Sequence, residues 1–204
     1  MAYPWATAIR RTGQLLVYLG AVPSGWSTVI REAVENFNAL SKKYSLGVVL
    51  AESDKPPNVK GGANVSVQTA NGAISYRFED IVLKDSLSGA ILHGRTKLIA
   101  RDGFNEQAAV FLPQNPQIST PNALRPVGPA VKKIIAIHEL IHACGLTDAE
   151  HRSDDVFNGN PNVEAGDTAT GDRVVITVAG KKHAMPPPLL SGPTANTIRR
   201  LWGA

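Results

Sequence analysis

The pattern of hydrophobic and polar positions predicts three helices along the chain. Between Ser27 and Tyr44, apolar residues recur at spacings of three and four, which places them on one side of a helix. A second helical pattern covers residues 129–144 and ends at Gly145, because glycine readily takes the left-handed conformation that closes a helix. We expect a final helix over residues 193–203.

Short apolar or alternating segments predict strands between these helices. The first of them is also compatible with the apolar part of a signal peptide, since Arg10 and Arg11 precede it, but its β-branched and aromatic residues favour a buried strand. Asn71-Gly72 lies between two alternating segments and is a strong signal for a tight hairpin turn. The expected strands are residues 14–22, 46–51, 64–69, 73–78, 96–100, 108–112 and 173–178.

The order of these elements predicts the fold class. Strands and helices are mixed along the chain, and we find neither an internal repeat nor a linker long enough to separate two folding units. Residues 113–129 and 147–172 are rich in turn-forming and polar residues, so we expect loops there. The sequence therefore predicts a single α+β or α/β domain over residues 1–204, with a mixed sheet packed against helices.

Composition and charge narrow the range of partners. The chain has 204 residues, of which 43% are hydrophobic and 19% charged, as in ordinary globular domains. The net charge of +4 comes from separate dibasic pairs rather than a basic run, which indicates a solvated surface and no nucleic-acid partner. No apolar run is long enough to span a bilayer, so no membrane partner is expected. The single cysteine, Cys144, excludes an intramolecular disulfide, so the fold depends on packing, to which a metal ion can add.

Candidate chemistry lies in the central helix, in the segment His138-Glu139-Leu140-Ile141-His142. Residues four apart lie on the same helix face, about one turn from each other, so both imidazoles can bind one metal ion. Glu139 lies about 100° around the helix, where its carboxylate can reach a water in the open position of the metal. A water activated by Zn²⁺ attacks a carbonyl, while the carboxylate takes its proton and passes it to the leaving amine.

The alternative interpretation is a pair of helical histidines partly buried against the core, with Glu139 in solvent. The surrounding helix is rich in isoleucine, so three polar groups without partners would be costly there. A metal ion provides those partners. We therefore expect a zinc site in which His138 and His142 are ligands and Glu139 is the catalytic general base.

The run from His138 to Asp148 resembles the metzincin signature, in which His-Glu-x-x-His continues with x-x-Gly-x-x and a third ligand. In that family the helix ends at the glycine, here Gly145, and the chain turns back to deliver the ligand, usually His and in a few branches Asp. Asp148 has the family's spacing, and His151 follows with the commoner ligand chemistry. The two are alternatives for the third zinc ligand, and the other one can hold a ligand imidazole in its tautomer.

Downstream residues extend the resemblance to matrix metalloproteinase and astacin-type catalytic domains. Met185 and the two prolines after it are similar to the methionine turn of that family, and a final helix follows. The resemblance implies a zincin-like α/β sandwich with a twisted mixed sheet, in which an edge strand such as Ala108–Leu112 binds extended peptide. Pro187 stands where many members carry a tyrosine, so the role of that tyrosine is vacant or filled elsewhere.

These observations predict a zinc metalloendopeptidase, a hydrolase that acts on a peptide or protein substrate. Two alternatives stay open: a structural or assembly module, for instance in a phage particle, that retains the zinc site, and a zinc amidase that cleaves peptidoglycan. A structural zinc does not need a poised base, so Glu139 favours an enzyme. Because no clear signal peptide is present, we expect synthesis in the cytoplasm; the final location is left open, with release and association with a virus particle as two alternatives.

Overall fold

The computed structural model describes residues 2–20, 22–119, 124–147, 150, 162–164, 173–178, 181–184 and 190–203, and the three short segments between 162 and 184 by their backbone alone. They form an α+β structure built on a mixed sheet. In chain order the elements are α1 (Thr7–Thr12), β1 (Gln14–Leu19), α2 (Ser24–Tyr44), β2 (Val49–Glu52), β3 (Val65–Ala70), β4 (Gly72–Phe78), β5 (Ile81–Leu87), β6 (Arg95–Arg101), β7 (Phe104–Pro113), β8 (Gln117–Ser119), β9 (Leu124–Pro126), α3 (Pro129–Ala143), β10 (Asn162–Glu164), β11 (Arg173–Val178), β12 (Lys181–Ala184) and α4 (Gly192–Trp202).

Five strands form the main sheet, in the order β2-β1-β3-β7-β6. β1 is parallel to both β2 and β3, and β3 is parallel to β7. Parallel neighbours need crossover connections, and α2 supplies the one between β1 and β2. β6 is antiparallel to β7 and forms one edge of the sheet.

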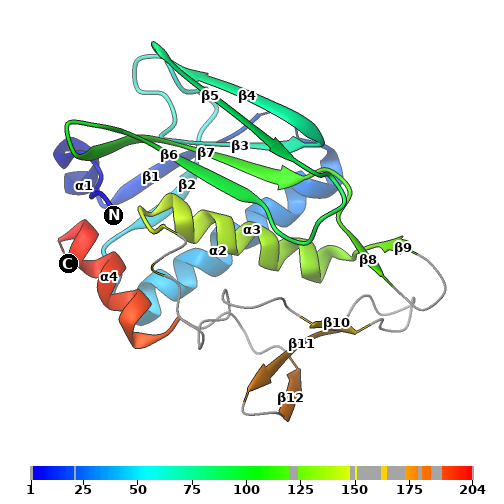
Figure 1. Ribbon diagram of the computed structural model, residues 1–204. Helices are drawn as coiled ribbons and strands as arrows, with labels where there is room; N and C mark the ends of the chain where they lie inside the picture. The colour runs from blue at the N-terminus through cyan, green and yellow to red at the C-terminus, as the bar shows by residue number, and fades with distance from the viewer. Residues whose placement is uncertain are drawn as a thin grey trace.

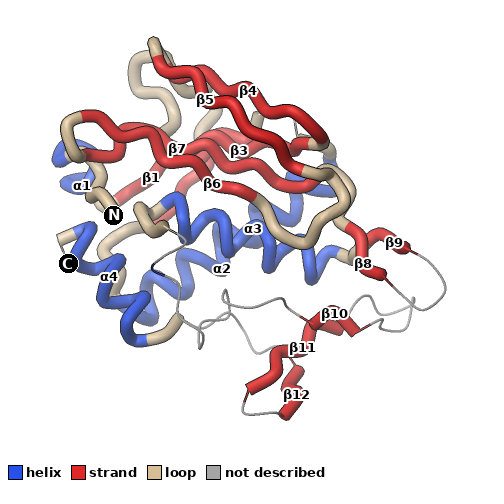
Figure 2. Tube along the Cα trace, viewed as in Figure 1, coloured by secondary structure: helices blue, strands red, loops and turns tan. Residues whose placement is uncertain are grey.

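Helices cover one face of the sheet, and a hairpin covers part of the other face. In Figure 1, α2 and α3 lie along one face, and the β4–β5 hairpin covers the other face near β6 and β7. Figure 2 shows the same separation, with the main sheet and the β4–β5 hairpin above α2 and α3. Side chains alternate along β7: Val110 and Leu112 join the core shared with the helices, whereas Ala109 and Phe111 join a second cluster under the hairpin. β7 is therefore buried on both of its faces.

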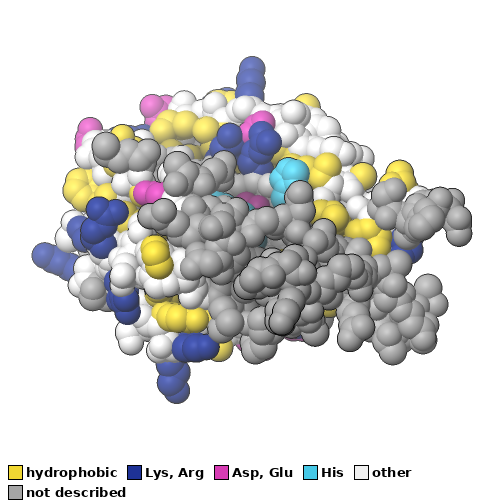
Figure 3. All heavy atoms as spheres, turned by 60° about the horizontal axis from the view of Figure 1, so that its bottom comes forward, with side chains coloured by type: hydrophobic (Ala, Val, Ile, Leu, Met, Phe, Trp, Pro, Cys, Tyr) yellow, Lys and Arg dark blue, Asp and Glu magenta, His cyan; other side chains and the backbone are white. Residues whose placement is uncertain are grey.

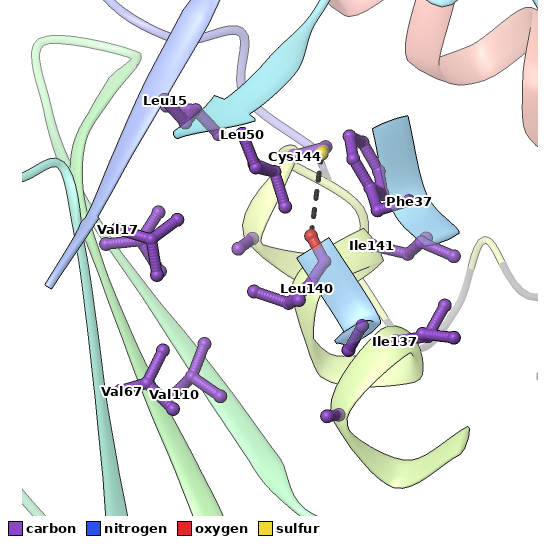
Figure 4. Packing of buried hydrophobic residues seen from close by; sticks show 14 of the residues in the cluster. Leu15, Val17, Phe37, Leu50, Val67, Val110, Ile137, Leu140, Ile141 and Cys144 are labelled. Atoms are coloured by element: carbon purple, nitrogen blue, oxygen red, sulfur yellow. Dashed lines mark hydrogen bonds between the residues drawn. The ribbon is translucent and has the colours of Figure 1, made fainter. Parts of the chain in front are cut away.

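The main core fills the space between the sheet and the two long helices. Leu15, Val17 and Val110 point from the sheet toward Phe37 of α2 and Leu140 of α3 (Figure 4). None of these side chains is more than 1% exposed. Full burial of an aliphatic or aromatic side chain contributes about 1.5–3 kcal/mol. This layer therefore determines how α3, the helix with the candidate site, lies against the sheet.

Cys144 belongs to the same core. It is fully buried, and its thiol donates a hydrogen bond of 3.5 Å to the Leu140 carbonyl (Figure 4). Burial raises the pKa of the Cys144 thiol, because the thiolate would lose its hydration there. Cys144 is therefore a neutral packing residue at the end of α3.

The three predicted helices are confirmed with shifted bounds. α2 begins at Ser24 rather than Ser27, α3 ends at Ala143, and Gly145 after it has a φ of +112°. The first apolar segment is strand β1 in the middle of the sheet, so the strand interpretation of residues 14–22 is confirmed over Gln14–Leu19. No helix in the described part of the chain is long and apolar enough to cross a membrane.

The hairpin predicted at Asn71-Gly72 is wrong. β3, which precedes this pair, lies between β1 and β7, whereas β4, which follows it, pairs with β5 through a tight turn at Glu79-Asp80. Glu79 has the positive φ, +51°, that the turn requires. Asn71 instead accepts a hydrogen bond of 3.0 Å from the Gly89 amide. Pairing of β3 with two distant buried strands outweighs the local turn preference.

The edge strand expected at Ala108–Leu112 is also wrong. These residues belong to β7, which pairs with β3 on one side and β6 on the other. A continuous apolar run is typical of a strand buried on both faces, which describes β7 better than an edge. The edge strand next to β7 is β6, and its sequence is more polar. The pattern did not predict the short or polar elements α1, β5, β8, β9, β10 and β12.

Candidate metal centre

α3 carries the candidate site and packs against β6 and β7. Pro129 lies in its first turn, where the missing N–H of proline has no helical partner to lose. Ile137 and Ile141 are buried in the core on one side of the helix. His138 and His142 are four residues apart and so lie on a common face, where His138 is half-buried and His142 is 5% exposed.

The two imidazoles converge. The Nε2 atoms of His138 and His142 are 3.1 Å apart, and the ring centroids are 4.8 Å apart with the planes inclined by 61°. Two imidazole nitrogens bound to one tetrahedral zinc, each at about 2.1 Å, lie about 3.4 Å from each other. The observed separation is close to this value, so the pair fits a shared zinc ion.

The backbone assigns the tautomer of His142. Its Nδ1 atom is 3.1 Å from the carbonyl oxygen of Leu146. A carbonyl can only accept, so Nδ1 carries the proton and donates it. Nε2 of the neutral ring is then the accepting nitrogen, and it faces His138 Nε2 at hydrogen-bonding distance. This is the arrangement in which a histidine binds a metal through Nε2 while a second hydrogen bond orients its ring.

The Glu139 side chain lies between α3 and the edge strand. The residue is 2% exposed. The Thr96 hydroxyl on β6 is 2.7 Å from Glu139 Oε2 and 3.1 Å from the Glu139 carbonyl oxygen. A buried carboxylate needs hydrogen-bond donors to replace water. Thr96 supplies one of them, so the orientation of Glu139 depends on a second element.

Gly94, just before β6, gives the Glu139 side chain its space. A Cβ atom on Gly94 would lie 2.7 Å from Glu139 Cγ and 2.7 Å from the Phe111 carbonyl oxygen. Because the Phe111 carbonyl belongs to the backbone of β7, it could move only at the cost of displacing the strand. Glycine is therefore the residue that fits here with Glu139 in its observed position.

Two tryptophans close the C-terminal end of α3. The last carbonyl groups of a helix have no helical N–H partner and need other donors. Trp5 Nε1 donates to the Ala143 carbonyl at 3.0 Å, and Trp202 Nε1 donates to the Cys144 carbonyl at 3.0 Å. The chain then turns at Gly145. Residues from both ends of the sequence thus hold the helix end that follows the histidine pair.

The residues expected to complete the metal shell, Asp148 and His151, lie outside the described residues, as does Met185. Thr147 and Glu150, the described residues nearest to Asp148, are joined by hydrogen bonds: the Glu150 carboxylate accepts from the Thr147 amide at 2.8 Å and from the Thr147 hydroxyl at 3.1 Å. Within the described part of the chain, no group of three His, Cys, Asp or Glu side chains comes together. Among the described residues, the candidate ligands are therefore the histidine pair on α3.

No protein-family model matches the chain, and no curated protein sequence matches it. The assignment of the site therefore depends on its own residues.

His93 is exposed and offers a contrast to the pair on α3. Figure 3, which brings the helix side of the molecule forward, shows histidine side-chain atoms (cyan) at the surface of this face.

Sequence reasoning missed Thr96, Gly94 and the Leu146 carbonyl. Thr96 and Glu139 are 43 positions apart, and no local periodicity connects them. The one available signal was a glycine shortly before the predicted strand at 96–100, since glycine beside a strand often marks a close approach. That signal does not identify the residue that approaches.

Proposed function

We propose that the chain is a zinc-dependent metalloendopeptidase of the metzincin type. One observation carries the proposal: His138 Nε2 and His142 Nε2 converge to 3.1 Å, next to the buried side chain of Glu139. A purely structural zinc site has no use for this carboxylate, whereas hydrolysis needs a base beside the metal-bound water. Asp148 or His151 would supply the third protein ligand.

The surroundings of the pair support the same proposal. The helix with both histidines packs against a mixed sheet with an antiparallel edge strand, and it is followed by Gly145 in a left-handed conformation. The last helix, α4, reaches the end of α3 through the Trp202 indole. The mixed sheet with an edge strand, the glycine after the helix and the final helix are features that the metzincin resemblance implies.

Each step of the reaction uses residues of this chain. Zinc bound by the histidine pair would lower the pKa of a bound water and polarise the scissile carbonyl. Glu139 takes a proton from the attacking water as the water oxygen bonds to the carbonyl carbon. The Glu139 carboxyl group then delivers that proton to the amide nitrogen as the C–N bond breaks, which releases an acid and an amine.

The edge strand favours an extended peptide as substrate. Among the described strands β6 pairs with β7 alone, and it contacts α3 next to Glu139. An edge strand offers backbone N–H and C=O groups to an added strand, so a peptide bound there runs past the histidine pair. A polypeptide is therefore the first substrate to test.

The decisive variant is Glu139→Gln, which keeps the shape of the side chain and removes the base. We expect the parent protein to bind one zinc ion by elemental analysis and to cleave a peptide library. We expect Glu139→Gln to keep its zinc and to lose at least about 100-fold in kcat, as for other general bases. Glu35→Gln, an exposed glutamate on α2, is the matched control and should retain parental activity.

The outcomes separate the candidate functions. A Glu139→Gln protein as active as the parent excludes the mechanism. Bound zinc without any hydrolysis of peptides or of purified peptidoglycan favours the assembly module. Cleavage of peptidoglycan cross-links alone favours the amidase, which uses the same pair and the same base.

A further inference from the structure

We propose that Gly94 and Thr96, at the start of β6, together position the Glu139 side chain, and we call this pair the Glu139 seat. Thr96 is a positioning residue whose hydroxyl holds the carboxylate, and Gly94 leaves the space for it. This inference rests on the proposed function, because it assigns a role within the same hydrolytic site. It concerns Thr96 and Gly94, two of the described residues that lie against the Glu139 side chain from outside α3.

The hydrogen bond from Thr96 is directed at the carboxylate. A threonine hydroxyl has one proton, and two oxygens of Glu139 lie within reach, Oε2 at 2.7 Å and the backbone carbonyl at 3.1 Å. The shorter contact and the charge of the carboxylate favour donation to Oε2. Because the hydroxyl also lies close to the Glu139 backbone, it restricts the side chain and the helix position together.

Two ion pairs on the opposite face of β6 stabilise the strand around Thr96. Thr96 pairs with Val110 and shares its helix-facing side, whereas its neighbours Arg95 and Lys97 point toward the β4–β5 hairpin. There Asp85 binds both of them, with distances of 2.7 Å to Arg95 Nη1 and 2.8 Å to Lys97 Nζ. The two ion pairs flank Thr96, so the hydroxyl projects from a strand that is held on both sides of its position.

Gly94 leaves the space that the Glu139 side chain occupies. A Cβ on Gly94 would approach Glu139 Cδ to 3.0 Å, in addition to its contacts with Cγ and with the backbone of β7. A methyl group there would displace either Glu139 or the start of β6. Gly94, by its lack of a side chain, and Thr96, by its hydroxyl, therefore both determine the position of the Glu139 carboxylate.

A base that is held in one orientation accelerates proton transfer but does not bind the substrate. Loss of the hydrogen bond that orients Glu139 should therefore lower kcat and leave KM nearly unchanged. We expect Thr96→Val, which has the same shape without the hydroxyl, to lose about tenfold or more in kcat. Its KM should stay within about twofold of the parent, and its zinc content should be unchanged. Thr96→Ser, which restores the hydroxyl, should recover most of the lost kcat.

A second measurement does not depend on metal or activity. In the metal-free protein, Thr96→Val should lower the melting temperature in the parent and by less than half as much in a Glu139→Ala background, since the partner is already absent there. Thr69→Val on β3 is the matched control, and its effect on the melting temperature should be the same in both backgrounds.

Different results would exclude the role of Thr96 and the proposed metallopeptidase function. If Glu139→Gln is inactive with zinc bound but Thr96→Val has parental kcat, the seat is excluded and the metallopeptidase stands. The seat is also excluded if Thr96→Ser is as impaired as Thr96→Val, because the hydroxyl is then irrelevant. If Glu139→Gln is fully active, the proposed function itself is excluded, whatever Thr96 does.

Discussion

Both nitrogens of the His142 ring have defined surroundings. Nδ1 donates to the Leu146 carbonyl, and Nε2 faces His138 Nε2 at 3.1 Å. A histidine must be unprotonated at the nitrogen that binds a metal. The hydrogen bond to Leu146 keeps the proton on Nδ1, so Nε2 is the unprotonated nitrogen that a metal ligand needs.

At the residue scale, the histidine pair should determine zinc affinity. We expect His138→Ala and His142→Ala each to weaken zinc binding more than about 100-fold, because the loss of a direct ligand exceeds the tenfold to 100-fold typical of its supporting partners. Competition with a chromophoric chelator measures this. His93→Ala, which removes an exposed imidazole, should bind zinc like the parent. Parental affinity in either α3 variant would show that the pair does not bind the metal.

At the element scale, β6 connects the site to the β4–β5 hairpin. Hydrogen bonds from Lys97, Arg95 and the Ser86 amide hold the pKa of Asp85 well below its usual range. The Asp85 side chain is 16% exposed, so its pairs are less screened than ordinary surface pairs. A carboxyl group whose pKa is lower in the folded state stabilises the fold above its unfolded pKa, and this contribution is lost as the pH falls.

Asp85→Asn should therefore lower the free energy of unfolding at pH 7 by about 1–2 kcal/mol. The difference between variant and parent should become smaller below about pH 4, where the carboxyl group of the unfolded parent chain is protonated. Urea unfolding at pH 7 and at pH 3 measures both effects. Asp80→Asn is the control: this side chain is 82% exposed, so its pair with Arg101 should contribute little. Equal losses for the two variants would contradict the role of Asp85.

At the scale of the whole molecule, both ends of the chain meet at the end of α3. The Trp5 and Trp202 rings are 6.5 Å apart, and both indoles donate to the last carbonyls of this helix. Both tryptophans belong to the same buried cluster as β1, α2 and α3. The position of the helix therefore depends on segments that are among the first and the last of the sequence.

Trp202→Phe should lower the free energy of unfolding by about 1–3 kcal/mol, because it leaves the buried Cys144 carbonyl without its donor. Trp26→Phe is a useful comparison, since it removes a longer indole hydrogen bond of 3.3 Å to the Gln114 carbonyl. We expect a smaller loss for Trp26→Phe in the same urea titration. If Trp202→Phe has parental stability, the indole hydrogen bond does not support the end of α3.

Local patterns predicted what depends on neighbours in sequence. The apolar spacing of α2 and α3, the strand character of β1 and the left-handed Gly145 all follow from short-range preferences, and the structure confirms them. Pairing partners were less predictable. Asn71-Gly72 has the composition of a hairpin turn, yet β3 lies between β1 and β7. Burial of β3 in the sheet stabilises the fold more than one favourable turn would.

The sequence by itself determined that His138, Glu139 and His142 occupy one helix, with both histidines on a common face, because helical geometry makes residues four apart neighbours. Only the tertiary structure decided what surrounds them. The Thr96 hydroxyl, the space at Gly94 and the edge position of β6 arise from contacts between strands and helices that are distant in sequence. Such contacts are selected by the packing of the whole core, so no window of sequence contains them.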